Sequence, residues 1–312
     1  MADVHAEVDG RVVALSNLDK QLFPDGTTKA EVIAYYSEIA PVMLPHLAGR
    51  AVTRLRFPDG TGAESFYEKN APAGTPDWVP VLEVIAADTR ISYPLVESPA
   101  ALVWLANLAA LELHTPQWRR EHQPEPPFAV DGDTLADLLV VDLDPGPGIT
   151  MADSARAALL VAAELADEGL VPVPRTSGGK GLQLQAAIAP VPADTAVGHV
   201  RGIANRLASR HPDLFVTTQA RTARTDRILI DWLQNQSVRN TICTYSLRGR
   251  ERPSVATPLT WDEVGAAAEG AALRFSPADV LARVAEHGDL AADLLANPRP
   301  TLRVPPGPPP AR

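Results

Sequence analysis

A run of four apolar residues, Leu138 to Val141, leads directly into the triplet Asp142-Leu143-Asp144. A short apolar run of this kind is typical of a buried strand. Side chains alternate along a strand, so both carboxylates are predicted to project from the same face at its end. Two carboxylates this close repel each other unless a cation or a basic group lies between them. The chain must therefore build a sheet in which a buried strand ends at a charged site.

Two further stretches fit the same chemistry. Ser177-Gly-Gly-Lys-Gly181 is a glycine-rich turn whose backbone N–H groups and lysine could hold phosphates, although it lacks the spacing of a P-loop. Ile228-Leu-Ile-Asp231 supplies another carboxylate at the end of an apolar run. Three carboxylates and a phosphate-binding turn indicate a site for Mg²⁺ or Mn²⁺ and a phosphoryl or nucleotidyl transfer. Each signal is ambiguous when taken alone: paired aspartates also occur in glycosyltransferases, phosphatases and acidic turns, and Asp231 alone is typical of a structural residue.

Additional segments make the pattern specific, and the chain resembles the polymerase domain of bacterial DNA ligase D, in the archaeo-eukaryotic primase superfamily. The resemblance covers about residues 12 to 290, and no ligase or nuclease segment follows, so a stand-alone primase-polymerase is expected. The segments that carry it, besides the three above, are Ser16-Asn-Leu-Asp-Lys-Gln-Leu-Phe-Pro24, Thr28-Lys-Ala30, Phe66-Tyr-Glu-Lys69, His114-Thr-Pro-Gln-Trp118 and Tyr245-Ser-Leu-Arg-Gly-Arg250.

The resemblance implies an α+β fold of the primase-polymerase type, with two β-sheet lobes flanked by helices around a central cleft. We expect one domain over residues 1–296 and a disordered, proline-rich tail over 297–312. Residue patterns predict a helix from Thr27 or Thr28 to about Leu44, with a capping box at Glu31. They also predict a buried helix over 101–113. The remaining predicted elements are helices over 150–168 and 194–210 and from 276 onward, and strands over 51–57, 64–67, 90–94, 171–175, 182–188, 214–218 and 228–232.

The implied reaction is template-directed nucleotidyl transfer that fills short gaps or ends during DNA break repair, with a preference for ribonucleotides. By resemblance, Asp142, Asp144 and Asp231 are the catalytic residues and hold two Mn²⁺ or Mg²⁺ ions. The residues implied to bind the incoming NTP or dNTP are Ser177, Gly179, Lys180, Gly181, Gln183, Arg248 and Arg56. Gln183 departs from the family, which commonly has His there; glutamine keeps a neutral N–H donor but cannot titrate near pH 6.5.

A second set of residues is implied to bind gapped or broken duplex DNA. Asn17, Lys20 and Lys29 match a pocket for a downstream 5′-phosphate, and Phe66, with Tyr67 beside it, matches an aromatic that stacks on a template base. For the two aromatics the alternative is strand packing, and for the two lysines it is a solvated face. Arg54 and Arg56, which alternate on one strand, should point the same way. The remaining candidates for DNA contact are Lys69, Arg221 and Arg224. His114 and His122 lack metal-ligand spacing and are assigned no catalytic part.

Lysine is scarce, with four residues against 24 arginines, and all four lie in segments that carry the resemblance: Lys20, Lys29, Lys69 and Lys180. Arginine cannot replace lysine where a compact point charge approaches a phosphate, so these positions are expected to be functional.

Net charge is the main observation against a nucleic-acid enzyme. The formal value is −10, whereas a basic footprint is usual. The stretch from Arg201 to Arg252, however, holds ten arginines against four acids and could form a basic face. Cys243 is the only cysteine, which excludes an intrachain disulfide, and no apolar stretch of ~20 residues occurs, so a cytoplasmic, nucleoid-associated protein is expected. Ku and a separate DNA ligase are the implied partners. Two rival classes remain: a weakly catalytic module that bridges DNA ends, and a metal-dependent glycosyltransferase.

Overall fold

The apolar run before Asp142 lies inside β9, the middle strand of a five-stranded sheet with the order β10-β11-β9-β13-β12 in a computed structural model of the chain. The structure describes residues 4–179 and 181–302. Alternation divides β9 between two environments. Leu139, Val141 and Leu143 are fully buried in a core shared with helices, whereas Asp142 and Asp144 belong to the opposite face. The pleat of this one strand therefore directs both carboxylates away from the helical layer.

The helices and strands alternate along the chain as the resemblance implies. The α-helices are α1 Lys29–Leu47, α2 Pro99–Asn107, α3 Met151–Asp167, α4 Ala193–Arg210, α5 Trp261–Ala268 and α6 Pro277–His287. The strands are β1 Val4–Val8, β2 Arg11–Leu15, β3 Thr53–Arg56, β4 Phe66–Glu68, β5 Val81–Ala86, β6 Thr89–Pro94, β7 Ala110–Thr115, β8 Phe128–Ala129, β9 Leu135–Pro145, β10 Val173–Thr176, β11 Leu182–Pro192, β12 Phe215–Val216, β13 Ile228–Asp231, β14 Thr241–Ile242, β15 Leu247–Arg248 and β16 Ser254–Val255. Short 3₁₀ helices include η2 Arg221–Arg224 and η3 Trp232–Asn235.

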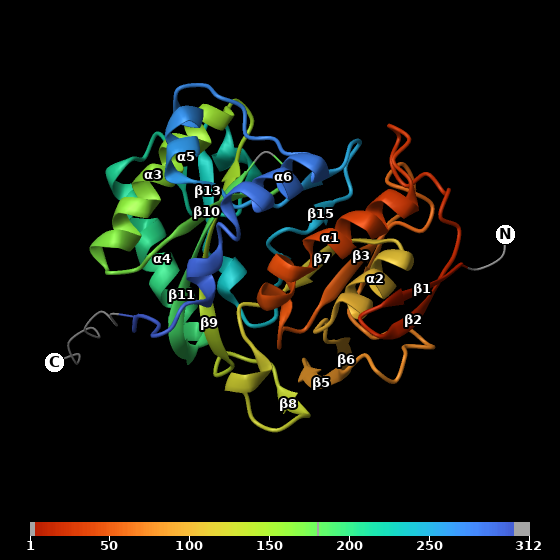
Figure 1. The fold of residues 1–312 in the computed structure, drawn as a ribbon. Coiled ribbons are helices and arrows are strands. Elements are labelled where there is room, and N and C mark those ends of the chain that lie inside the picture. The colour runs from red at the N-terminus through yellow and green to blue at the C-terminus, as the bar shows by residue number, and fades with distance from the viewer. Residues whose placement is uncertain (1–3, 180, 303–312) are drawn as a thin grey trace.

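Two lobes are visible in Figure 1, each built on its own sheet. We call the first the N-lobe; it holds the four-stranded sheet β14-β7-β3-β4 with α1 and α2. The second, the C-lobe, holds the five-stranded sheet, with α3, α4 and α5 packed against one of its faces. A cavity lined by residues of both sheets lies between them. The predicted α+β fold with two sheet lobes around a cleft is confirmed.

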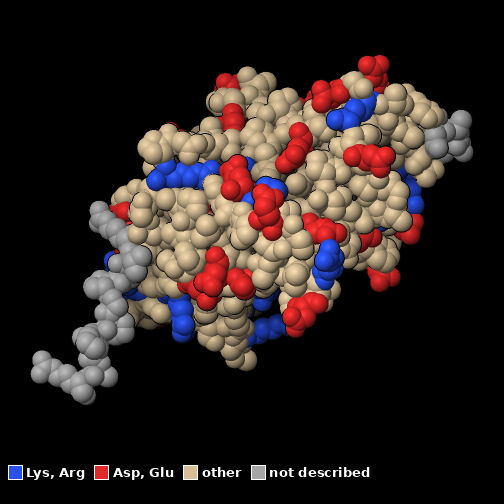
Figure 2. Space-filling model, turned by 90° about the horizontal axis from the view of Figure 1, so that it is seen from below, with Lys and Arg blue, Asp and Glu red and all other residues tan. Residues whose placement is uncertain are grey.

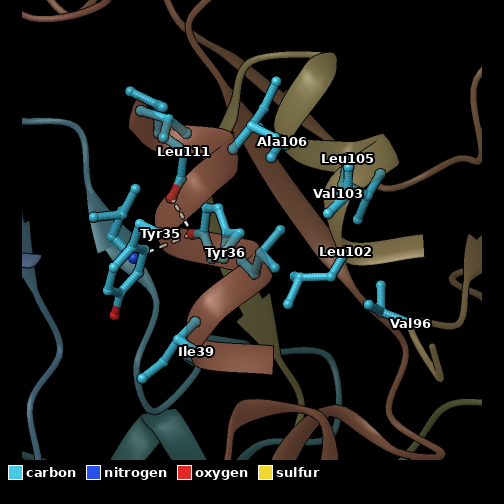
Figure 3. Close-up of a cluster of buried hydrophobic side chains, with 14 of the residues drawn as sticks. Tyr35, Tyr36, Ile39, Val96, Leu102, Val103, Leu105, Ala106 and Leu111 are labelled. Atoms are coloured by element: carbon cyan, nitrogen blue, oxygen red, sulfur yellow. Dashed lines mark hydrogen bonds between the residues drawn. The ribbon is translucent and has the colours of Figure 1, made fainter. Parts of the chain in front are cut away.

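Local sequence signals account for α1. Thr28 caps the helix and accepts a hydrogen bond from the Glu31 backbone, while the Glu31 side chain accepts from the Thr28 backbone, which forms the predicted capping box. Inside the N-lobe, the Tyr36 hydroxyl of α1 donates to the Leu111 carbonyl at 2.6 Å and accepts from the Leu247 backbone at 3.1 Å (Figure 3). This buried tyrosine therefore ties α1 to β7 and β15.

The predicted helix over 101–113 is wrong in its second half. Helix α2 ends at Asn107, Ala109 has a left-handed backbone with φ of 56°, and β7 begins at Ala110. Both halves are buried, and a continuous apolar run does not distinguish a buried helix from a buried strand. The error matters because β7 carries Glu112 and His114 to the cleft.

The predicted disordered tail needs correction for residues 297–302. Arg299 pairs with the buried Asp137 carboxylate at 2.6 Å, the Pro300 carbonyl accepts from Ala189, and Leu302 is buried in the C-lobe core. Asp137 also pairs with Arg50 and Arg119 of the N-lobe; burial opposes its ionisation, but these guanidinium groups lower its pKa. Proline content describes the segment alone and does not reveal such partners. The rest of the predicted tail, 303–312, lies outside the described residues.

Among the described residues, no helix has the length and apolar character needed to cross a membrane.

Candidate active site

Three carboxylates converge at the end of the central strands of the C-lobe. Asp142 and Asp144 lie near the end of β9, and Asp231, the last residue of β13, is the direct cross-strand partner of Asp142. One oxygen from each of the three lies within 4.8 Å of the others. The sequence prediction that these three residues come together is confirmed by this geometry.

The electrostatics of the cluster are unfavourable without a cation. Burial and the neighbouring Asp144 raise the pKa of Asp142 to about 7, and a hydrogen bond from Gln183 opposes part of this rise. Burial and Asp231 raise the pKa of Asp144 as well. Converging, partly desolvated carboxylates are the ligands that Mg²⁺ and Mn²⁺ prefer. The residues present therefore fit a hard divalent cation, which would neutralise the repulsion.

Asp231 is oriented by its own surroundings. Its Oδ1 accepts from Gln219 Nε2 at 2.9 Å and from the Leu233 backbone, and its Oδ2 accepts from Gln234 Nε2 at 3.0 Å. Gln219 in turn accepts from Arg224 at 2.6 Å, so the predicted DNA contact Arg224 is linked to the third carboxylate. Its neighbour in η2, Arg221, is exposed.

A cavity of about 930 Å³ adjoins the carboxylates between the two lobes. The glycine-rich turn forms part of its wall and closes through a Ser177 N–H to Gly181 carbonyl hydrogen bond of 3.0 Å. Glycine is required twice here. A Cβ on Gly178, whose φ is +69°, would lie 2.3 Å from Arg248, and a Cβ on Gly181 would lie 2.7 Å from the Leu143 carbonyl. Lys180 lies outside the described residues. The predicted nucleotide-binding residues that line the cavity are Ser177, Gly179, Gly181, Gln183 and Arg248.

The opposite wall contains residues to which sequence reasoning gave no role. The buried Glu112 carboxylate pairs with His114 Nε2 at 3.0 Å and with Arg248 Nη1 at 3.1 Å, and it accepts from the Gly249 backbone. Burial opposes the ionisation of Glu112, but His114 and Arg248 lower its pKa below its ordinary value. His114 and Arg250 also line the cavity. Metal-ligand spacing gave no indication of a role for His114. The sequence signal that could have indicated one is the alternation of Glu112 and His114 on one strand, which places both side chains on the same face.

The β3 arginines share one carboxylate. Arg54 Nη2 lies 3.1 Å from Glu68 Oε2, and Arg56 Nη1 lies 2.9 Å from Glu68 Oε1, so the two point the same way as predicted. Arg54 is 0 % exposed, and it also donates to the Asn70 carbonyl. The Arg54 guanidinium is therefore enclosed by protein in this structure, and its contact with DNA stays a prediction. Arg56 is not among the residues that line the cavity.

Two exposed aromatics stand on the edge strand β4. Phe66 is 44 % and Tyr67 53 % exposed, so strand packing buries neither side chain. The Tyr67 ring meets the His114 ring edge to face, with centroids 5.9 Å apart, and this contact places β4 next to the cavity wall. Lys69, just after β4, is half-buried. An exposed aromatic beside the cleft has the geometry needed to stack on a base.

Of the three residues of the predicted phosphate pocket, Asn17 and Lys20 lie in the turn before α1, and Lys29 is the first residue of that helix. The Lys20 N–H donates to the Asn17 carbonyl, and the Lys29 N–H donates to the Lys20 carbonyl. Lys29 is buried, with Nζ 3.4 Å from Ser16 Oγ, whereas Lys20 is exposed and pairs with Asp59 at 2.8 Å. The sequence prediction that the three come together is met, although their role is not tested by this geometry.

The three α4 arginines of the arginine-rich stretch have partners within the protein. On α4, Arg206 and Arg210 pair with Glu164, and Arg201 stacks on Trp232. Basic and acidic side chains are interspersed over the face in Figure 2. Helix periodicity turns Arg206 and Arg210 toward Glu164 of α3, so adjacency along the chain does not by itself make a basic face.

Fold and site together define a two-lobed protein whose cleft brings three carboxylates next to a glycine-rich turn. The chain matches the family described as LigD, primase-polymerase domain, over residues 28–291. It is 42 % identical over 288 residues to the multifunctional non-homologous end joining protein LigD of Mycolicibacterium smegmatis, and 31 % identical over 288 residues to the bifunctional protein of Bacillus subtilis. These alignments cover 91 % of this chain but 36 % and 44 % of the relatives.

Among solved structures, the polymerase domain of Mycobacterium tuberculosis ligase D in complex with DNA is similar to this chain, with a TM-score of 0.86 and 41 % identity. The similarity covers 91 % of this chain and 98 % of that one. The chain belongs to the LigD primase-polymerase domain family.

Proposed function

We propose that this protein is a nucleotidyltransferase that extends a primer strand in the cleft, directed by a DNA template, to fill short gaps or ends during double-strand break repair. The observation that carries the proposal is the convergence of Asp142, Asp144 and Asp231 beside a glycine-rich turn in one cavity. The relatives named above are end-joining proteins, and the similar solved domain binds DNA, which supports the assignment.

In the proposed reaction, Asp142, Asp144 and Asp231 hold two Mg²⁺ or Mn²⁺ ions. When bound, such ions make a 3′-hydroxyl more acidic and neutralise charge on the leaving pyrophosphate. The protein's own groups would position the triphosphate: Ser177, Gly179 and Gly181 of the turn line the cavity, and the Arg248 fork suits phosphate oxygens.

The Glu112 carboxylate holds the two basic side chains of this wall, His114 and Arg248, where an anion could contact them. Without nucleotide it neutralises Arg248 and accepts a hydrogen bond from His114. A bound triphosphate would replace part of that pairing, since both side chains face the cavity and Glu112 remains behind them. We therefore add His114 and Arg250 to the proposed nucleotide-binding residues.

For the DNA, we propose that Phe66 and Tyr67 stack on template bases and that Asn17, Lys20 and Lys29 hold a downstream 5′-phosphate. Lys69, Arg221 and Arg224 would contact the backbone. Ku and a separate DNA ligase are the proposed partners, by the end-joining role that the relatives' names state. Family membership argues against the glycosyltransferase alternative.

Extension of a labelled primer across a short gap with a 5′-phosphate, in Mn²⁺, tests the proposal directly. We expect template-dependent addition, with ribonucleotides used more efficiently than deoxyribonucleotides. Binding of the gapped duplex without any addition would instead support the weakly catalytic end-bridging module. Equal use of both nucleotide types would remove only the ribonucleotide preference.

A further inference from the structure

One row of side chains crosses the C-lobe sheet at the level of the active site. Arg175 on β10 is the direct cross-strand partner of Gln183 on β11, Gln183 is the partner of Asp142 on β9, and Asp142 is the partner of Asp231 on β13. Directly paired residues share a face of a sheet. The row therefore runs from a cation through an amide to two of the three proposed metal-binding carboxylates.

Arg175 is 1 % exposed, and its described hydrogen-bond partners are all neutral. Nε and Nη2 donate to the Gln183 Oε1 atom at 3.1 and 2.5 Å. Nη1 donates to Thr244 Oγ1, and Nη2 also donates to the Ile242 carbonyl. A buried guanidinium without a directly paired carboxylate is costly, and this desolvation lowers the pKa of Arg175 to about 10. A site that keeps such a residue is expected to use it.

The chemistry of the row determines which end of the Gln183 amide faces the carboxylate. A guanidinium has donors only, so it selects the oxygen of Gln183 and leaves the NH₂ group for Asp142. Gln183 and Asp142 are direct cross-strand partners, and the Gln183 amide lowers the pKa of Asp142, as expected when the NH₂ group faces the carboxylate. If the amide were reversed, its oxygen would face the carboxylate and its NH₂ would face the guanidinium, and both contacts would be repulsive.

We propose that Arg175 is a positioning residue for the metal site: it fixes the orientation of the Gln183 amide, which in turn holds the Asp142 carboxylate in place for a divalent cation. The proposal rests on the proposed metal-dependent function. Hydrogen bonds of this kind around metal ligands typically contribute 10–100-fold to metal affinity.

The other side of the cluster repeats the arrangement. Arg224 donates to the Gln219 oxygen at 2.6 Å, and Gln219 Nε2 donates to Asp231 at 2.9 Å. Two of the three carboxylates are thus held by a glutamine whose oxygen is bound by an arginine. The difference is exposure: Arg224 lies in a surface 3₁₀ helix, whereas Arg175 is enclosed by both lobes.

A purely structural role for Arg175 makes a different prediction. Its bonds to Ile242 and Thr244 join the C-lobe sheet to the segment that begins with β14 of the N-lobe, so any substitution is expected to lower stability. Stability alone therefore cannot distinguish the two roles. Metal affinity can, because a structural arginine has no reason to act through Gln183.

The test measures Mn²⁺ binding to the full chain, without nucleotide or DNA, by the electron paramagnetic resonance of free Mn²⁺. Wild type is compared with Arg175→Lys, Gln183→Met, the double variant of these two, and Asp142→Ala. The lysine of Arg175→Lys keeps the positive charge but lacks the forked guanidinium. Arg119→Lys is the matched control. Arg119 is also a buried arginine whose pKa is lowered, but it belongs to the Asp137 cluster outside the cavity.

We expect Mn²⁺ affinity to fall about 10-fold or more in Arg175→Lys and about 10–100-fold in Gln183→Met. The double variant should bind Mn²⁺ no more weakly than Gln183→Met, because both changes break the same row of contacts from Arg175 through Gln183 to Asp142. Arg119→Lys should keep wild-type affinity even if its melting temperature falls.

Wild-type Mn²⁺ affinity in Arg175→Lys, or additive losses in the double variant, would overturn the positioning role. If Arg175→Lys does not fold, Gln183→Met decides alone, and unchanged affinity in that variant also overturns it. Asp142→Ala separates this result from a failure of the proposed function. Retained Mn²⁺ binding in Asp142→Ala would mean that the carboxylates are not the metal site, and both proposals would fall.

Discussion

The Asp142 carboxylate opposes folding at neutral pH in the metal-free protein. Its pKa is about 7 in the folded state, against an ordinary value of 3.8. Between these values the folded state holds a proton that the unfolded state has lost, so this group lowers the free energy of unfolding as pH rises from about 4 to about 7. In the folded, metal-free protein, the Asp142 carboxylate carries the negative charge that a cation needs only above about pH 7.

We therefore predict that Asp142→Asn is more stable than wild type at pH 8 in the presence of EDTA, by an amount on the order of a few kcal/mol. The advantage should shrink toward pH 4, where the carboxyl gains a proton in the unfolded state as well and the two states no longer differ in protonation. Urea unfolding of both proteins at several pH values measures the difference. A variant that is less stable than wild type at pH 8 would contradict the raised pKa.

Gln183 has no titratable group, so nucleotide affinity should show no step attributable to this position. Gln183→His should introduce a step in nucleotide KM. We expect it near pH 6.5, the ordinary range of an imidazole. Measurement of KM from pH 5.5 to 8 in both proteins checks this. Identical profiles would mean that residue 183 does not act on the triphosphate.

At the scale of elements, strand alternation was the most informative signal in the sequence. It predicted that Asp142 and Asp144 share a face and that Arg54 and Arg56 point together, since each depends only on the period of two. That Asp231 joins the first pair depends on strand pairing, and it was expected from its place at a strand end and from the family resemblance. Alternation could not predict which side of a strand is enclosed. Arg54 became buried because β4 brings Glu68 over it, and that pairing depends on residues distant in the sequence.

The errors in the elements have a common cause. The 101–113 run is apolar except for Asn107 and Glu112, so no clear period separates α2 from β7. The Glu112 contacts to His114 and Arg248 join β7 to β15, more than a hundred residues apart in the chain. Only the folded arrangement of the two strands brings these groups together, which is why sequence spacing gave His114 no role.

The turn between β2 and α1 carries a prediction about DNA ends. If Lys20 and Lys29 bind a 5′-phosphate, removal of the phosphate should weaken binding of a gapped duplex by about 10–100-fold per contact, since charge-assisted hydrogen bonds contribute ~1.5–3 kcal/mol. Lys20→Ala combined with Lys29→Met, which preserves packing at the buried position, should bind both duplexes equally. Fluorescence anisotropy at two salt concentrations measures the preference, which salt should erode.

Asp59→Asn provides the opposite change. It removes the carboxylate that pairs with Lys20 at 2.8 Å and should strengthen the preference for the phosphorylated gap. Equal wild-type affinity for both duplexes would leave the lysines without this role.

At the scale of the whole molecule, a net charge of −10 does not by itself exclude DNA binding, because the distribution of charge, and not its sum, sets the electrostatic field at the cleft. Glu164 and Glu168 neutralise α4 arginines, and Glu68, Glu112 and Asp137 hold arginines between or within the lobes. Total charge therefore was a poor guide, since pairing in three dimensions is what determines the field at the cleft.

The Asp137 cluster joins both lobes and the segment after η4 (Ala292–Leu295). We predict that Arg299→Ala lowers the free energy of unfolding by roughly 1–3 kcal/mol, because it removes one charged partner of a fully buried carboxylate while Arg50 and Arg119 remain. Arg299→Lys should lose less. Thermal melts of both variants and wild type test this, and an unchanged melting temperature in Arg299→Ala would show that the segment does not contribute to stability.

The central claim is that the acidic cluster catalyses nucleotidyl transfer, and it predicts a separation between chemistry and binding. Extension of a gapped primer in Mn²⁺ should fall by more than about 100-fold in Asp142→Ala and in Asp144→Ala, since loss of a metal ligand costs several kcal/mol at ~1.4 per tenfold. Affinity for the same duplex, measured in parallel by anisotropy, should stay close to wild type, because contacts to phosphates elsewhere supply most of it. Extension at more than about a tenth of the wild-type rate in either variant would contradict the account.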